Sequence, residues 1–224
     1  MLSIELLKNY LKANIIGCKI EYLLETNSTN VDAWKHFNDR CKEGTVFITD
    51  NQKNGRGRRQ NKWLSFPGKS LTFSFILKPQ TELNKLGLLP LLTGVSIVKS
   101  LNKLPPIHIG LKWPNDIMIK KKKVGGILIE SSTGENGTMI VVGIGLNINE
   151  SIDDIPDKLQ NLATSFHIEY HKIFSREVIF SSILNEFENL YLNNWHEIIP
   201  KWEKNCIHKN HEVTFHNDSK RITG

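Results

Sequence analysis

The sequence lacks several features that mark other classes of protein. No apolar run reaches the length of about 18 residues that spans a bilayer, and Met1–Lys8 has neither the basic nor the apolar region of a secretory signal. The 3 cysteines, Cys18, Cys41 and Cys206, form no CxxC pair, which favours a reducing cytoplasm over a disulfide scaffold. Internal repeats and low-complexity linkers are also absent. We therefore expect a cytoplasmic protein with one domain of ordinary size.

The composition is that of a globular chain. Of the 224 residues, 39% are hydrophobic and 23% are charged, a balance that does not suit a disordered protein. The formal net charge is +6. An excess of positive charge suits nucleic acid and anionic small molecules equally, so the charge alone assigns no function.

Apolar periodicity predicts an α+β domain with one mixed, mainly antiparallel sheet and helices packed mostly on one face. Strands are expected at Ile20–Leu24, Thr45–Thr49, Leu71–Leu77, Ile107–Leu111, Ile117–Ile119, Val124–Ile129 and Met139–Ile144. Helices are expected behind a Ser3 cap, over Leu86–Leu101 and from Ser175 to about Trp202. Lys120–Lys123 is expected to turn a hairpin, and a strand pair to begin at His211.

A further helix is expected after Asn27–Asn30, four residues that favour helix N-termini. Apolar side chains behind it recur at steps of three and four residues, at Val31, Trp34, Phe37 and Cys41. This spacing predicts a helix that buries the face carrying these four residues.

Gly55–Arg59 combines two glycines with three arginines inside Asp50–Lys62, a polar stretch that predicts a mobile loop. Glycines let the backbone approach a ligand closely, and guanidiniums attract anions. The pentapeptide is not the GxxxxGK[ST] phosphate loop, and a basic surface turn explains it as well. Trp63 follows this polar stretch, in which few apolar residues are available for it to pack against. It either stacks on a flat heterocycle such as adenine or plugs the base of the loop.

Lys112–Asp116 reads Lys-Trp-Pro-Asn-Asp and places an ammonium at the end of a strand. Alternation with Ile109 and Leu111 directs the Lys112 side chain to the open face of the sheet. Pro114 stiffens the turn that follows. An exposed lysine at a strand end is the simpler interpretation. A cationic loop facing a fixed lysine would nevertheless suit chemistry in which two anions must meet.

Three other patterns in the sequence are less specific. Asn147, after a strand end, suits either a base edge or a turn. His167 and His171 have the spacing of a helical zinc pair without a clear third ligand. A last group matches no zinc-finger spacing: Cys206, His208, His211 and His216. We predict no metal site from these residues.

The order and spacing of five segments resemble those of the biotin protein ligase family. The segments are Ser28–Asn30, Gln52 with Gly55–Arg59 and Trp63, Lys112–Asp116, Lys123–Glu130 and Gly143–Asn147. The resemblance covers roughly residues 15–205, and five segments in register are far more specific than any one of them.

The resemblance implies a two-step ligation. The carboxylate of biotin attacks the α-phosphorus of ATP, which releases pyrophosphate and leaves biotinyl-AMP. The ε-amine of one lysine on a biotin carboxyl carrier protein, a subunit of acetyl-CoA carboxylase, then displaces AMP. Mg²⁺ would travel with the phosphates and not sit in an all-protein cage. The resemblance allows a homodimer and involves no membrane.

The resemblance also implies a role for individual residues. The biotin-binding residues would be Ser28, Thr29, Asn30, Gln52, Gly55, Arg56, Gly57, Arg58, Lys112, Gly125 and Gly126. The nucleotide-binding residues would be Arg56, Arg58, Trp63, Lys112 and Asn147. Lys112 and Arg58 would be the catalytic residues, with Lys112 holding the biotin carboxylate and the α-phosphate.

Two departures and two alternatives accompany the resemblance. A catalytic domain is expected at residues 1–195 and the start of a small SH3-like domain at residues 196–224, incomplete where the sequence ends. Residues 1–17 are too few for the winged helix of some relatives, so we expect no DNA-binding domain.

A lipoate–protein ligase would share the fold and the lysine. A basic nucleic-acid-binding domain would instead use Arg56–Arg59 and Lys120–Lys123 as phosphate contacts. The arginine-rich loop with its tryptophan favours biotin.

Overall fold

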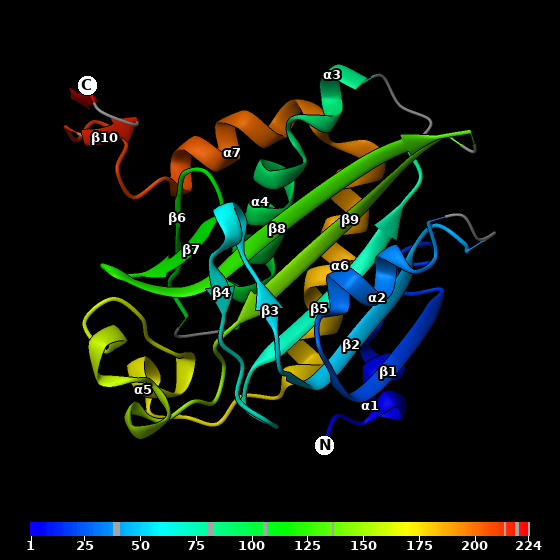
Figure 1. Ribbon diagram of the computed structural model, residues 1–224, viewed down its shortest axis with the longest axis horizontal. Helices are drawn as coiled ribbons and strands as arrows, with labels where there is room; N and C mark the ends of the chain where they lie inside the picture. The colour runs from blue at the N-terminus through cyan, green and yellow to red at the C-terminus, as the bar shows by residue number, and fades with distance from the viewer. Residues whose placement is uncertain are drawn as a thin grey trace.

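A twisted sheet forms the centre of the computed structural model, which describes residues 1–37, 41–79, 83–104, 107–135, 137–212, 214–217 and 220–223 (Figure 1). Within these residues the sheet has seven strands in the order β1-β2-β5-β9-β8-β7-β6. Their bounds are β1 Lys19–Thr26, β2 Thr45–Gln52, β5 Leu71–Leu77, β6 Gly110–Lys112, β7 Asp116–Ile119, β8 Lys122–Gly134 and β9 Gly137–Leu146. Only β1 and β2 pair in parallel. The predicted α+β fold with a mixed, mainly antiparallel sheet is confirmed.

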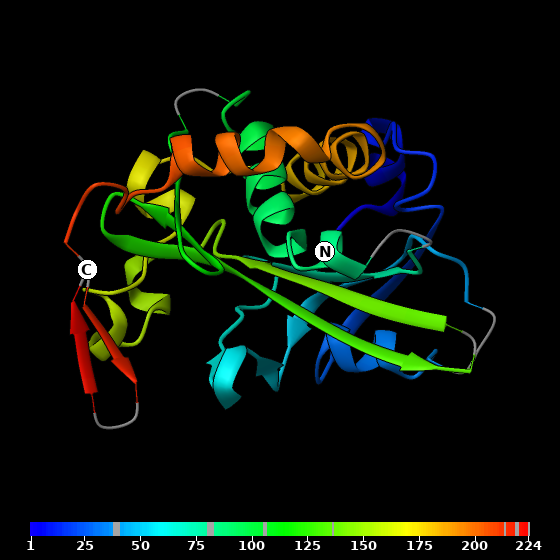
Figure 2. The ribbon, with the colours of Figure 1, turned by 90° about the horizontal axis from the view of Figure 1, so that it is seen from above.

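The main helices cover one face of this sheet, while α2 and a small hairpin lie on the other (Figure 2). The helices are α1 Ile4–Tyr10, α2 Thr29–Trp34, α3 Leu83–Leu86, α4 Leu89–Leu101, α5 Phe166–Tyr170, α6 Arg176–Asn193 and α7 Ile198–Asn205. The hairpin pairs β3 (Gly55–Arg56) with β4 (Lys62–Trp63). A second small pair, β10 (Thr214–Asn217) with β11 (Lys220–Thr223), confirms the strands expected after His211.

Strand β5 separates an apolar layer from a polar one. Phe73 and Phe75 meet Phe180 and Phe187 of α6 edge to face, with ring centroids 4.9 and 4.7 Å apart. All four rings are fully buried. Ser74, between the two phenylalanines, is also buried but contacts α2 on the opposite face. Because side chains alternate along a strand, one strand supplies both the core and a polar surface under α2.

The structure corrects the prediction for the helix after Asn30. Helix α2 ends at Trp34, and Val31 is 37% exposed. Its buried residues are Thr29, Asn30, Asp32 and Ala33. Trp34, Phe37 and Cys41 do pack, partly buried, against a small apolar cluster, so the periodicity located part of the buried surface. It missed the first turn of α2, which is held to the sheet by hydrogen bonds.

Other element boundaries also differ from the predictions. Part of the predicted loop Asp50–Lys62 is ordered as strand, because β2 continues to Gln52 and the β3–β4 hairpin follows. The helical stretch from Ser175 to Trp202 divides at Asn194 into α6 and α7. Strand β6 begins at Gly110, later than Ile107, and α4 begins at Leu89 with Pro90 in its first turn. The Ser3 cap is confirmed, since its hydroxyl accepts from the Leu6 N–H.

Candidate active site

A pocket of about 720 Å³ opens beside α2 and the β3–β4 hairpin. It is formed by the first turn of α2, the hairpin, the β6–β7 turn and the middle of β8 and β9. The residues predicted from the sequence that line it are Ser28, Thr29, Asn30, Gln52, Arg56, Gly57, Arg58, Trp63, Lys112 and Gly126. Most of the predicted site is therefore brought together in one cavity.

Three predicted site residues lie outside the pocket lining. Gly55 borders an adjoining cavity behind the hairpin, where an added Cβ would lie 2.5 Å from Nε2 of Gln52. Gly125 faces the core, where an added Cβ would lie 2.4 Å from Cδ2 of Leu146. The amide of Asn147 donates to the carbonyl of Thr164 at 2.9 Å. The predicted ligand contacts of these three residues stay predictions.

The N-terminus of α2 presents hydroxyl and amide groups to the pocket. Ser28 is the N-cap, but its side chain makes no capping hydrogen bond. The backbone N–H of Thr29 donates to Oε1 of Gln52 at 2.9 Å, which ties α2 to the end of β2. All three residues are almost fully buried, so the bonds form away from solvent. A ligand in this pocket would meet polar groups whose positions are already fixed.

A continuous row of hydrogen-bonded side chains runs from this end of the pocket to the arginine hairpin. The members of this polar row are Gln52, Thr29, Ser74, Asn30, Glu130 and Arg56. Ser74 and Glu130 were not predicted as site residues. Glu130 ends the segment Lys123–Glu130, so the motif contained it without indicating a role. Ser74 lies inside an apolar strand pattern, where nothing marks its contact with α2.

Positive charge gathers at the other end of the pocket. Lys112 is exposed at the end of β6 and makes no ion pair with a described residue. Lys123, which is expected in a hairpin turn and begins the family-like segment Lys123–Glu130 but is not a predicted site residue, also lines the pocket, and its ammonium pairs with Asp116 at 2.6 Å. Nη1 of Arg58 donates to Oδ1 of Asn115 at 3.3 Å. The cavity thus has a neutral polar end and a cationic end, which suits a ligand with a phosphate beside a polar ring.

Trp63 lies flat against a floor of glycine. Gly126 and Gly145 are direct partners on β8 and β9, and an added Cβ at Gly145 would lie 2.5 Å from Cε2 of Trp63. The indole Nε1 is buried without a hydrogen-bond partner among the described residues. Trp63 therefore joins the hairpin to the pocket floor, and its stacking on adenine stays a prediction.

A buried ion pair holds the N-terminal root of the hairpin. Nη2 of Arg176, the first residue of α6, lies 2.8 Å from Oδ1 of Asp50. Nη1 of the same guanidinium donates to the carbonyl of Ser70 at 3.0 Å, so one side chain joins both roots of the hairpin segment. Burial raises the pKa of Asp50, but hydrogen bonds from Tyr22 and Arg176 outweigh burial and lower the pKa overall. Burial and the bond to Asp50 raise the pKa of Tyr22 to about 12.

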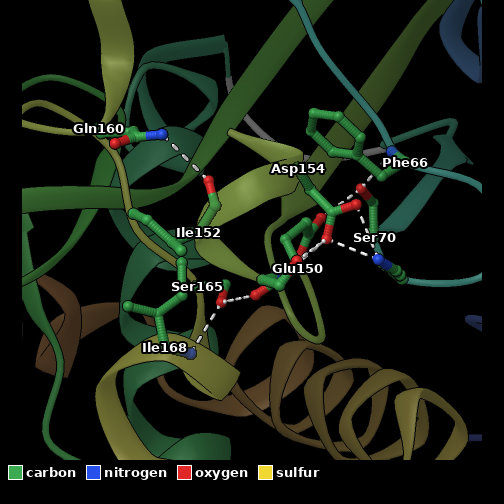
Figure 3. A network of polar contacts seen from close by, with 10 residues as sticks. Phe66, Ser70, Glu150, Ile152, Asp154, Gln160, Ser165 and Ile168 are labelled. Atoms are coloured by element: carbon green, nitrogen blue, oxygen red, sulfur yellow. Dashed lines mark hydrogen bonds and ion pairs between the residues drawn. The ribbon is translucent and has the colours of Figure 1, made fainter. Parts of the chain in front are cut away.

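A second buried carboxyl supports the C-terminal root, as Figure 3 shows. The hydroxyl of Ser70 accepts from the Phe66 N–H at 2.8 Å and donates to Oε1 of Glu150. Glu150 is fully buried, and burial raises its pKa to about 7. Beside it, Asp154 caps the Ser151 turn and pairs with Lys69. Through Ser70, the Glu150 carboxyl is linked directly to the C-terminal root of the hairpin segment.

No metal centre or membrane span is found in the part of the chain that the structure describes. Its histidines, cysteines and carboxylates form no group of three that could hold a metal ion. None of its helices has both the length and the apolar character needed to cross a bilayer. The predicted route of Mg²⁺, with the phosphates, stays a prediction.

Comparisons with known proteins identify the family. The model of the biotin/lipoate A/B protein ligase family matches residues 22–147, more than half of the chain. The chain belongs to this family. The bifunctional ligase/repressor BirA of Bacillus spizizenii is 36% identical over 182 residues, which are 81% of this chain and 56% of that protein. The chain thus spans little more than half the length of that relative.

Solved structures agree with this membership of the biotin/lipoate ligase family. The biotin protein ligase of Aquifex aeolicus, in complex with biotin and ATP, has a TM-score of 0.77 and 30% identity, covering 92% of this chain and 85% of that one. The Leishmania major enzyme in complex with biotinyl-5-AMP has a TM-score of 0.71 at 21% identity and supports the fold alone. The predicted family is confirmed, while the role of each site residue stays a prediction.

Proposed function

We propose that this protein is an ATP-dependent biotin protein ligase. The observation that carries the proposal is the two-ended pocket, in which buried hydroxyl and amide groups adjoin a cluster of cations. The hydrogen-bonding end favours biotin over lipoate. The cyclic urea of biotin offers two N–H donors and a carbonyl acceptor, whereas the dithiolane ring of lipoate offers no hydrogen-bond donor. The relatedness to an enzyme solved with biotin and ATP supports the same choice.

In the first step the biotin carboxylate attacks the α-phosphorus of ATP. A C–O–P anhydride bond forms, the bond to the β-phosphate oxygen breaks, and pyrophosphate leaves with the electron pair. Lys112, Lys123 and Arg58 would neutralise the two anions as they approach, which is where fixed positive charge lowers a barrier most. Magnesium would accompany the nucleotide phosphates, because Asp116, a carboxylate of the pocket, is already paired with Lys123.

In the second step the ε-amine of a carrier lysine attacks the carbonyl carbon of biotinyl-AMP, the amide forms, and AMP leaves. The partner we propose is a biotin carboxyl carrier protein. Until transfer, the mixed anhydride must be shielded from water. The β3–β4 hairpin adjoins the pocket and carries Arg56 and Arg58, which suits it to that task.

We also propose that the catalytic domain extends through Ile207, beyond the predicted boundary at residue 195. Ile198 is fully buried in the main core, and the Ile207 N–H donates to the carbonyl of Leu111 at 3.0 Å. The three free cysteines support the proposed cytoplasmic location. The homodimer and the small SH3-like domain stay predictions.

Pyrophosphate release tests the activity. The protein is incubated with ATP and Mg²⁺, adding biotin, lipoate or RNA in separate reactions. Release that depends on biotin, followed by a mass increase of one biotinyl group on a carrier domain, is the expected result. Release with lipoate alone would make the protein a lipoate ligase, and RNA binding without release would make it a nucleic-acid-binding domain.

A further inference from the structure

Glu130 lies where the polar row meets the arginine hairpin. Its Oε2 accepts from Nδ2 of Asn30 at 2.8 Å and from Nε1 of Trp34 at 3.3 Å. Its Oε1 accepts from Nη2 of Arg56 at 2.7 Å. One carboxylate on β8 thus binds two donors of α2 with one oxygen and a guanidinium of β3 with the other.

The carboxylate sets the direction of the hydrogen bonds behind it. A carboxylate accepts and does not donate, so Asn30 must turn its NH₂ group to Glu130 and its Oδ1 to Ser74. Ser74 then donates its single hydroxyl hydrogen to Oδ1 of Asn30, at 2.6 Å. Oγ1 of Thr29 lies 2.6 Å from Oγ of Ser74 and 3.3 Å from Oε1 of Gln52. Because Ser74 has already given its only hydrogen to Asn30, Thr29 must be the donor in the shorter contact.

The direction of the row decides what Thr29 offers to a ligand. Its hydroxyl hydrogen is committed to Ser74, so toward the pocket the oxygen presents lone pairs. Oε1 of Gln52 accepts from the Thr29 N–H, which leaves the Nε2 donor of Gln52 beside Gly55. An acceptor next to an amide donor matches a ring in which an N–H adjoins a carbonyl.

Gly143, opposite Asn30, leaves the room that the Asn30 amide occupies. Gly143 on β9 is the direct partner of Ser74 on β5, and an added Cβ there would lie 2.1 Å from Oδ1 of Asn30. Asn30 therefore lies flat against the strand, with its amide between Ser74 and Glu130. The geometry leaves it two orientations, related by exchange of its oxygen and nitrogen.

We propose that Glu130 is a positioning residue that sets the direction of hydrogen bonding along the polar row and makes the Thr29 hydroxyl an acceptor for a ring N–H of the substrate. The assignment of that N–H to the cyclic urea of biotin rests on the proposed function. Because the same carboxylate binds Arg56, one side chain positions both the ring end of the pocket and the hairpin.

Two substitutions separate these tasks. Glu130→Gln keeps an oxygen for the two donors of α2 but removes the charge that holds Arg56. Glu130→Met removes both and frees the Asn30 amide to turn over. A second variant, Ser74→Ala, leaves Glu130 in place but frees the hydroxyl hydrogen of Thr29 to point into the pocket. The matched control is Glu21→Gln, which breaks a surface ion pair with Lys19 on β1.

Calorimetry without ATP measures the coupling. Each protein is titrated with biotin and with two analogues, in each of which one of the two ring N–H groups is replaced by oxygen. For each protein, the loss of affinity from biotin to the weaker-binding analogue is measured, and these losses are compared between the proteins. In wild type, Glu21→Gln and Glu130→Gln, the affinity is expected to fall about tenfold from biotin to the weaker-binding analogue. Glu130→Met and Ser74→Ala are expected to bind biotin itself more weakly than wild type. From biotin to the weaker-binding analogue, their affinity is expected to fall by twofold or less. An undiminished loss in both of these variants would overturn the proposal.

A readout without ligand keeps this inference distinct from the proposed function. In the wild type the side-chain NH₂ of Asn30 and the indole N–H of Trp34 share one oxygen of Glu130, so an NMR cross-relaxation signal between them is expected. Glu130→Gln should retain the signal and Glu130→Met should lose it. Retention in Glu130→Met would overturn the proposal. If wild type gives the signal yet binds no biotin, the proposed function fails and the direction of the row stands.

Discussion

Arg176 and Asp50 form a buried ion pair, 2.8 Å between Nη2 and Oδ1, in which each side chain is only 6% exposed. The two residues are far apart in sequence, yet their contact fixes the point where β2 leaves the core for the pocket. The remaining bonds of the pair are to the Ser70 carbonyl, the Leu2 N–H and the Tyr22 hydroxyl. The pair therefore joins the N-terminus, α6 and both roots of the hairpin segment.

Arg176→Met is expected to destabilise the protein by about 3–5 kcal/mol, because it leaves the buried Asp50 carboxylate without its cation. Urea unfolding followed by circular dichroism measures the change. Lys19→Met is the control, since it removes a cation from the exposed pair with Glu21 and should leave the unfolding midpoint unchanged. Equal midpoints for Arg176→Met and wild type would show that the pair contributes nothing to folding.

The buried carboxyl of Glu150 is expected to lower the free energy of unfolding as the pH rises. Burial raises its pKa to about 7 from the ordinary glutamate value of 4.5. Between these values the folded state holds a proton that the unfolded state has released, so the free energy of unfolding falls as pH increases. The stabilisation is fully present below about pH 4.5 and is lost as the pH passes the folded pKa near 7.

Glu150→Gln should remove this dependence, because the amide stays neutral and its oxygen can still accept from Ser70. Relative to wild type, the variant is expected to gain stability from pH 5 to pH 8, by on the order of 2–3 kcal/mol across the range. Urea unfolding at several pH values measures the difference. A difference that stays constant with pH would place the Glu150 titration outside this range.

Binding of biotin with ATP is expected to slow hydrogen exchange in Asn51–Lys62. This segment carries charge to pair with phosphates, and most of its side chains are exposed in the structure. Mass spectrometry should detect new protection there, with little change in the buried strand Leu71–Leu77, which serves as an internal control. Unchanged exchange across the segment would mean that the hairpin does not close on the ligand.

The sequence predicted the sheet and most pocket residues for different physical reasons. The strand Leu71–Leu77 follows from its alternation of apolar and small polar residues, which predicts one buried face. Both faces are buried in the structure, because α2 covers the polar face. The location of Ser28 at the start of α2 follows from its preference for helix N-termini. The burial of Thr29 and Asn30 on α2 was not predicted, because periodicity counts apolar residues and these two side chains are buried by hydrogen bonds.

Contacts between segments that are far apart in the chain could not be predicted from the sequence. Glu130 and Asn30 are 100 positions apart, and nothing local in either segment indicates that they meet. The run of four lysines that ends at Lys123 predicts a solvated turn. The pairing of Lys123 with Asp116 depends on the register of β7 and β8, which a bulge shifts between Ile117 and Met118. Such register details are set by tertiary packing.

Two of the lysines that line the pocket, Lys112 and Lys123, offer the sharpest test of the proposed chemistry. Lys112 was predicted as the chief catalytic residue, and the structure adds Lys123 in the same pocket, held by Asp116. Either ammonium can neutralise the carboxylate and the α-phosphate as their bond forms. Removing one preorganised donor costs roughly a hundred- to a thousandfold in rate, about 3–4 kcal/mol. Because Asp116 already fixes the position of Lys123, we expect Lys123→Met to reduce adenylation at least as much as Lys112→Met.

Pyrophosphate release from biotin and ATP measures both variants, alongside their thermal melts. Methionine keeps the length and apolar stem of lysine, so each variant should melt close to wild type. Lys120→Met is the matched control: this lysine belongs to the same basic run, but its ammonium pairs with Glu169 at 2.9 Å, and it is not among the pocket-lining residues. Its adenylation rate should equal that of wild type. A variant of Lys112 or Lys123 that melts normally and releases pyrophosphate at the wild-type rate would remove that lysine from the chemistry.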